Sequence, residues 1–188
     1  KTPSREKIFI RQPSRGSEEE PIAREILASL MKRAFRRPIS KSDLIKPIAF
    51  YRDGAREGGF EAGIESALKS ILVSPKFLFR IEKEPIQVTP GTVYRISDLE
   101  LASRLSFFVW SSLPDDELLD LAVAEKLSVS DVLETQVRRM LSDPRSNSLV
   151  NNFASQWLHL RNLDSITPDL RLYPNFDDNL RQAFRKET

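Results

Sequence analysis

Apolar residues recur along this chain at intervals of three and four positions, which is the spacing of one face of an α-helix. The stripe is continuous over residues 21–37 and is closed by Pro38, because the residue before a proline is driven out of helical geometry. A second helix is predicted over residues 40–57, ended by Gly58 and Gly59, and a third over residues 60–74. Three helices on short connections predict a small helical bundle.

The helical pattern is interrupted at residues 83–96. Pro90 and Gly91 are typical of a type II turn, which predicts a short hairpin or extended linker between two halves of the chain. Directly after it, Ser97 and Glu100 have the spacing of a capping box, in which each side chain hydrogen-bonds the backbone N–H of the other residue. We therefore predict that a new helix begins at Ser97.

Further helix starts are marked by Pro114, Ser130 and Asp143. After a loop from Asp164 to Tyr173, the four-residue steps of Phe176, Leu180 and Phe184 predict a last helix. The predicted fold class is all-α, with about seven or eight helices in two consecutive modules. The predicted organisation is an irregular N-terminal arm at residues 1–20, helical module one at 21–82, a linker at 83–96, and helical module two at 97–188, which the end of the sequence cuts short.

The composition removes several classes of chemistry. The 188 residues contain no cysteine and one histidine, which excludes disulfides, thiolate zinc sites, cysteine nucleophiles and multi-histidine metal sites within this sequence. Lysine and arginine number 29 against 27 acidic residues, so the net charge of +2 gives no reason to expect nucleic acid as a partner. No apolar run approaches the roughly 20 residues that span a membrane.

Asp115 and Asp116 are the candidate catalytic carboxylates, because paired carboxyl groups can act as acid and base when their pKa values differ. Their place after Pro114 favours a structural role instead, since anions in the first turn of a helix meet free N–H groups and the positive end of the helix dipole. His159 is the third catalytic candidate, as a general base. Without a nucleophile motif beside it, a boundary position on an amphipathic helix is the simpler interpretation.

Arg33, Arg36 and Arg37 form a basic helix end that is the candidate site for an anion such as phosphate, sulfate or an acidic polysaccharide. Basic residues also belong in the last turn of a helix, where they complement its dipole, and the acidic stretches at 18–20 or 57–65 would neutralise them. Anion binding therefore requires that the three guanidinium groups converge without carboxylate partners.

Five aromatic residues, Trp110, Trp157, Phe107, Phe108 and Phe153, would form a sugar-stacking platform if two of the rings faced water. Their helical spacing beside leucine and valine predicts instead that they belong to the core. The sequence contains no glycine-rich phosphate loop, no H-E-x-x-H and no G-x-S-x-G, so no catalytic motif accompanies them.

Several stretches of the sequence have the pattern of known families. They include residues 34–38, 59–64, 72–80, 101–118, 138–141 and 143–145. Through them the sequence resembles, over nearly its whole length, the tandem domains of unknown function, families fifteen-ninety-five and fifteen-ninety-two, found in large planctomycete-type proteins. No catalytic residues are established for these families, so the resemblance transfers none.

The resemblance implies a context. Such proteins are usually exported, which places this chain in the periplasm or outside the cell, and they often carry a c-type cytochrome-like segment elsewhere. The implied partners are other domains of the same polypeptide or a co-encoded exported protein. No Cys-x-x-Cys-His occurs in this sequence, so haem c is expected only elsewhere. Cysteines that commonly stand near Arg11 and Ile22 in the families are missing here, and with them a disulfide that would tie the arm to the first helix.

These observations predict a non-catalytic structural or interaction module of a larger exported, haem-containing protein. The alternative is part of an extracellular oxidoreductase or of a polysaccharide-acting hydrolase, for which Asp115, Asp116 and His159 are the available groups. Apolar surface left open near the end of the chain would support the module. A deep polar cleft that holds the three candidates would support the enzyme.

Overall fold

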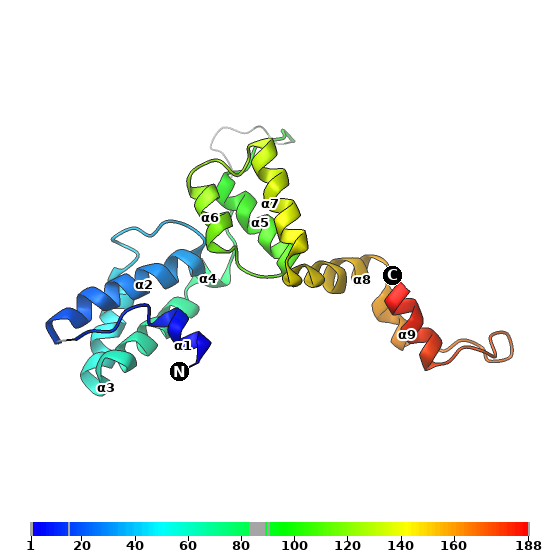
Figure 1. The fold of residues 1–188 in the computed structure, drawn as a ribbon, viewed down its shortest axis with the longest axis horizontal. Helices are drawn as coiled ribbons and strands as arrows, with labels where there is room; N and C mark the ends of the chain where they lie inside the picture. Colours follow the sequence, from blue (N-terminus) through cyan, green and yellow to red (C-terminus); the bar gives the residue numbers. More distant parts are fainter. Residues whose placement is uncertain (1, 15, 83–88, 90, 188) are drawn as a thin grey trace.

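The computed structural model describes residues 2–14, 16–82, 89 and 91–187. Within this part of the chain every regular element is helical and no strand is present, which confirms the all-α prediction. Figure 1 shows two helical regions side by side and an extension that leads away from them toward the C-terminus. Nine α-helices are described, against the seven or eight expected.

The additional helix is α1 (Pro3–Ile8), which lies in the N-terminal arm that was expected to be irregular. Proline fits the first turn of a helix because the N–H that it lacks would have no partner there. Arg5 of α1 pairs with Glu61, and its guanidinium lies 4.7 Å from the ring centroid of Phe9. Ile8 and Phe9 pack against the first core, so contacts with the body hold the arm in this conformation. A short 3-10 turn, η1 (Gly16–Glu18), then leads into the next helix.

The first helical region consists of α2 (Glu19–Phe35), α3 (Ile45–Leu72) and the single turn α4 (Pro75–Leu78). Gly59 interrupts α3 with a φ of 80°, as the sequence predicted, and the two halves of the helix fold back on each other. A Cβ added at Gly63 would lie 2.7 Å from the ring of Tyr51, so this close approach requires glycine. The core of the region is made by Ile22, Ala23, Ile26, Leu27, Met31, Ala34, Phe35, Ile48, Tyr51, Ile64, Ala67 and Ile71.

Asp43 lies in the loop between α2 and α3 and connects this loop to the segment just after α2 and to α4. Its side chain is 3% exposed and accepts hydrogen bonds from Arg37 Nη1 and Nη2 at 2.9 and 2.8 Å. Lys76 Nζ at 2.6 Å, from α4, and the Ser40 backbone N–H and hydroxyl complete its partners. The hydrogen bonds from Arg37 hold the pKa of Asp43 far below its ordinary value, although burial alone would raise it.

The second helical region consists of α5 (Asp98–Trp110), α6 (Asp116–Val123) and α7 (Ser130–Ser142). The capping box predicted at the start of α5 is present, with Ser97 and Glu100 each bonding the backbone of the other. Trp110 is buried and donates from Nε1 to the carbonyl of Met140 at 3.0 Å, which joins α5 to α7. The core of this region is separate from the first, and consists of Ala102, Val109, Trp110, Leu118, Ala122, Leu127 and Met140.

Residues 141–187 are named here the extension. It begins at the end of α7 and contains η2 (Pro144–Ser146), a π-helical turn η3 (Leu149–Ala154), α8 (Ser155–Trp157), η4 (Leu160–Asp164) and α9 (Asp178–Glu187). In Figure 1 these elements lead away from the body formed by α1 to α7. No side chain of the extension is buried in the described structure, which contrasts with the two cores.

Several predicted helix starts differ in detail. Ser130 is the first residue of α7 and makes no capping hydrogen bond, whereas Asp143 caps the short η2 by accepting from the N–H of Arg145 at 2.8 Å. The last helix begins at Asp178, two residues after Phe176, because Asp177 accepts from the N–H of Leu180 at 2.8 Å and fixes the start there.

The predicted hairpin between the two regions falls largely on residues 83–88 and 90, which lie outside the described residues. At its described end, the Thr92 N–H donates to the carbonyl of Thr89 at 3.1 Å, and Gly91 has a φ of 88°. This positive φ is the conformation that a glycine permits in a tight turn.

The Asp43 hydrogen bonds lead to a first prediction. Asp43→Asn keeps the shape of the side chain but removes the charge that Arg37 and Lys76 face. Because the two cations are part-exposed, water can solvate them after the change, and the loss is that of charged hydrogen bonds to one buried carboxylate, about 1.5 to 3 kcal/mol. Urea unfolding should therefore show a loss in this range. Asp53→Asn, at an exposed position paired with Arg56, is the control and should change the free energy by less than about 0.5 kcal/mol. Equal effects would contradict the structural role of Asp43.

A second prediction concerns acid. Glu20 accepts from Arg52 of α3 and from Arg24 of its own helix, and these hydrogen bonds lower its pKa from 4.5 to about 2. Because the pKa is lower in the folded state, the stability that Glu20 contributes is present above its unfolded pKa and is lost as the pH falls from 4.5 toward 2. The urea midpoint should therefore fall over this window.

Glu20→Gln should make that decline shallower, because glutamine has no proton to take up. Glu57→Gln, at an exposed position of α3, is the control and should leave the slope as it is in the wild type. A Glu20→Gln slope identical to that of the wild type would show that the Arg24 and Arg52 contacts do not stabilise the folded state.

Candidate interaction surface

Asp115 is the N-cap of α6, and both of its carboxylate oxygens are occupied. Oδ1 accepts from the N–H of Leu118 at 3.1 Å, while Arg139 donates to Oδ2 at 2.7 Å and to Oδ1 at 3.1 Å. Burial raises the pKa of Asp115, but the hydrogen bonds from Arg139 and Leu118, together with the charges of Arg139 and Arg145, outweigh it and the net shift is downward. A carboxylate held ionised in this way caps a helix and pairs with arginine.

Asp116, the second candidate carboxylate, pairs with one of the candidate anion-binding arginines. Arg33 Nε and Nη2, at the end of α2, donate to its two oxygens at 3.0 and 2.7 Å. Asp120 lies one helical turn after Asp116 on α6, and it accepts a hydrogen bond from Lys32 Nζ of α2 at 2.6 Å. These two ion pairs join the first helical region to the second, so residues that the sequence offered for chemistry form the contact between the regions.

Arg36 is buried although its side chain is charged. It follows α2 in the left-handed conformation, with a φ of 56°, and its two terminal nitrogens donate to four backbone carbonyls, those of Ala34, Lys76, Phe77 and Phe79, at 3.1 to 3.5 Å. Burial is the main reason that its pKa is lowered, with the charge of Arg80 adding to it. The guanidinium carbon also lies 6.0 Å from the ring centroid of Phe107 on α5.

The condition stated for anion binding, three guanidinium groups that converge without carboxylate partners, is therefore not met by these arginines. Arg33 and Arg37 each have a carboxylate partner, Asp116 and Asp43, and the terminal nitrogens of Arg36 are bonded to carbonyls. The neutralising carboxylates are not those at 18–20 or 57–65 that the sequence offered. They come from the loop after α2 and from the first turn of α6.

His159 lies on the exposed corner between α8 and η4, where its backbone is left-handed with a φ of 56°. In the described part of the chain no interaction joins its ring to Asp115 or Asp116. The three catalytic candidates are thus not brought together as acid, base and positioning group. No cluster of metal-ligating side chains was found among the described residues, and none of their helices is long and apolar enough to cross a membrane.

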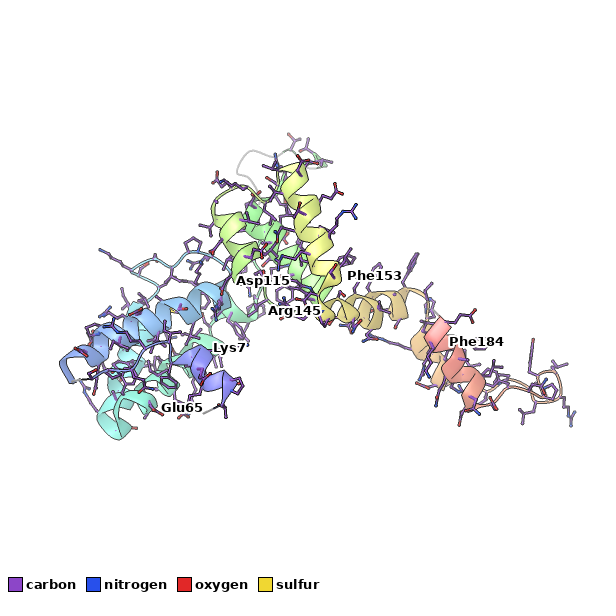
Figure 2. All side chains as sticks on the ribbon, in the orientation of Figure 1. Lys7, Glu65, Asp115, Arg145, Phe153 and Phe184 are labelled. Carbon is purple, nitrogen blue, oxygen red and sulfur yellow. The ribbon has the colours of Figure 1, made fainter. Side chains whose placement is uncertain are left out.

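The aromatic residues are divided between the core and the surface. Trp110 is buried as predicted, with Arg145 stacked 3.5 Å from its ring centroid. The prediction is wrong for the others, since Phe108, Phe153 and Trp157 are 53%, 48% and 70% exposed and Phe107 is partly exposed as well. The helix that carries Phe153 and Trp157 packs on α5 only at its start, so its apolar face has no second layer to cover it. Figure 2 shows Phe153 where the extension leaves the body.

These exposed rings contact one another in a row. Phe108 meets Phe153 edge to face, with centroids 5.2 Å apart and an interplanar angle of 66°, and Phe153 lies 6.0 Å from Trp157 at 30°. The first pair is therefore tilted and the second is closer to parallel, so the three rings do not share one flat face.

An apolar hollow lies at the distal end of the extension, between the loop before α9 and α9 itself. Its volume is about 450 Å³, and apolar and aromatic side chains form most of its wall. In Figure 2, Phe184 lies on α9 in this distal part, far along the extension from Phe153. The lining residues are Pro168, Leu172, Tyr173, Pro174, Asn175, Phe176, Leu180 and Phe184.

The sequence predicted a last helix that carries Phe176, Leu180 and Phe184, and it left the residues from Asp164 to Tyr173 in a loop. The apolar spacing of Phe176, Leu180 and Phe184 correctly indicates a helix face, and it does not say what covers that face. The length of the loop at 165–177 was the one available signal that the last helix is exposed. Helices that pack against each other in a compact domain are usually joined by shorter connections.

The two compact helical regions and the extension define an all-α protein built from two consecutive helical regions. Residues 22–82 match a family described as Protein of unknown function (DUF1595), and residues 96–188 match one described as Protein of unknown function (DUF1592). The chain is therefore a tandem of these two domain families, as the resemblance predicted. Neither the search of curated proteins nor the search of solved structures found a match.

The contact between the regions can be measured by a double-mutant cycle, which gives the third prediction. Arg33→Ala and Asp116→Ala should each lower the unfolding free energy, and their coupling should be about 0.5 to 1 kcal/mol, the range of a partly exposed bidentate pair. Arg24→Ala combined with Asp116→Ala is the control, because Arg24 pairs with Glu20 instead, and the two effects should add. A coupling of zero would mean that the two regions do not meet through these side chains.

Proposed function

We propose that this chain is a non-catalytic interaction module, in which the two helical regions form a support and the extension docks onto a protein surface. The observation that carries the proposal is that no described side chain after Met140 is buried, although many are large and apolar. Those at least 40% exposed are Leu141, Val150, Phe153, Trp157, Leu158, Ile166, Leu170, Leu172, Tyr173 and Phe184.

The total surface supports this reading. The chain exposes 13,230 Å². A compact protein of 21.6 kDa is expected to expose about 9,200 Å². The excess of about 4,000 Å² is total surface, polar and apolar together, as expected for a chain with an extended segment. The large apolar side chains exposed on that segment are what indicates an interaction site. Helices as short as α8 and α9 are marginal without packing, so a partner would stabilise them as well as cover them.

The charge of the extension indicates the kind of partner. Between residues 141 and 187 there are six basic and six acidic side chains, so the segment is neutral overall. A polyanion would not be attracted to it, whereas the apolar rows and a mixed polar rim are typical of a protein interface.

The families to which the chain belongs extend the proposal to its context. We infer a parent polypeptide that is exported to the periplasm or beyond, with any c-type haem carried outside this segment. The resemblance stated above supports this context, and the missing Cys-x-x-Cys-His agrees with the location of the haem. The enzyme alternative has no comparable support, because the groups it requires serve as a helix cap, an ion pair and an exposed corner.

The fourth prediction tests whether the extension is covered. Hydroxyl-radical footprinting of the intact parent protein should show Phe153 and Trp157 oxidised several-fold more slowly, after correction for intrinsic reactivity, than their exposure predicts. Phe79, which is 61% exposed and lies outside the extension, is the internal control and should be oxidised at the rate its exposure predicts. Rates for Phe153 and Trp157 that match their free exposure would show that nothing docks here, and the interaction role would fall.

A further inference from the structure

The extension carries both a projecting apolar side chain and an apolar hollow. Trp157 is 70% exposed at the end of α8 and is not among the residues that line the hollow of its own chain. The hollow lies between the loop before α9 and α9, so the two features belong to different parts of one segment. At protein interfaces, an exposed tryptophan of one partner commonly anchors the contact by filling an apolar pocket of the other.

The sizes of the two features are compatible. A cavity of 150 Å³ lined by apolar residues is large enough to bind benzene, and the hollow here has a volume of about 450 Å³. Leu172, Phe176, Leu180 and Phe184 give the hollow an apolar lining, and Tyr173 and Asn175, which carry polar groups, line it as well. The volume is sufficient for an indole ring, whose apolar body suits such a lining and whose N–H can pair with a polar group.

Because the same chain carries an exposed tryptophan and an apolar hollow, each of two copies can supply what the other receives. If Trp157 of each copy enters the hollow of the other, the two copies are related by a two-fold axis and the assembly is closed. The balanced charge of the extension means that two identical segments do not repel. The excess surface of about 4,000 Å² per chain far exceeds the roughly 800 Å² that each partner contributes to a standard interface.

We propose that the partner of the extension is a second copy of this chain, and that Trp157 of each copy inserts into the hollow of the other. This inference rests on the proposed interaction role and names its partner. In this arrangement Trp157 is the anchor residue of the interface. The hollow that binds it is formed by the loop at 168–176 and by α9.

The fifth prediction is that the chain dimerises through Trp157. Sedimentation velocity over a wide range of concentration should show a species of twice 21.6 kDa that dissociates on dilution. The chain has two tryptophans and Trp110 is already buried, so a blue shift of tryptophan emission on association reports Trp157. Trp157→Ser should weaken the dimer by about thirtyfold or more, as expected for an anchor residue. Far-UV circular dichroism checks that the variant keeps its helices.

Ile45→Ser is the matched control, because Ile45 is also 70% exposed but lies at the start of α3, and its dimer should be unchanged. Leu172→Glu places a charge in the hollow and should weaken the dimer as Trp157→Ser does. A mixture of the two variants should recover part of the association, since the copy with an intact hollow can receive the tryptophan of the other.

Three results would overturn the inference. A chain that remains monomeric throughout rules out the second copy, and if Phe153 and Trp157 are still protected in the parent protein, the interaction role stands with another partner. A dimer that Trp157→Ser does not weaken places the interface elsewhere. A mixture that recovers no association contradicts the reciprocal exchange.

Discussion

One buried guanidinium, that of Arg36, fixes the end of α2 against α4 at the place where the two helical regions meet. Arg36 stands where α2 ends, in a left-handed conformation that turns its side chain back under the helix. It is surrounded by carbonyls, three of them from α4 and the residue after it, and it faces Phe107 of α5. A buried charge is costly unless its donors are bonded, and here the carbonyl dipoles serve that purpose. The end of α2, α4 and α5 are thereby held around one side chain.

The exposed ion pairs around this point depend on the geometry that Arg36 sets. Lys32 and Arg33 reach Asp120 and Asp116 because the end of α2 is fixed beside α6. On the other side, Arg104 Nε of α5 donates to Glu82 at 2.9 Å, just after α4. Each exposed pair contributes little alone, so the pairs orient the two regions while their separate hydrophobic cores supply most of the stability. Contacts of the same kind occupy Asp115 and Asp116, the candidate catalytic carboxylates, which pair with Arg139 and Arg33.

The sequence predicted the parts of this structure that depend on near neighbours. The capping box of Ser97 and Glu100 and the break at Gly59 need only residues a few positions apart, and both are present. The structural role expected for Asp115 follows from the same local rule, and its cap is observed. What failed depends on distant residues. Three of the four carbonyl partners of Arg36 lie 40 to 43 positions away. A helical stripe also does not tell whether Trp157 meets a second layer. An arginine in the left-handed conformation has no marker in sequence either.

The body of the protein has two hydrophobic cores, and the extension has none in the described structure. Native-state hydrogen exchange of the isolated chain tests this difference most directly. The concentration must be low enough to keep the chain free of partners. The amides of α2, α3, α5 and α7 should exchange slowly and with similar opening free energies, whereas those of residues 149–184 should exchange at nearly the rate of an unfolded chain. Amides of the extension as well protected as those of α5 would contradict the account, because they would show that the segment is stable without anything to cover it.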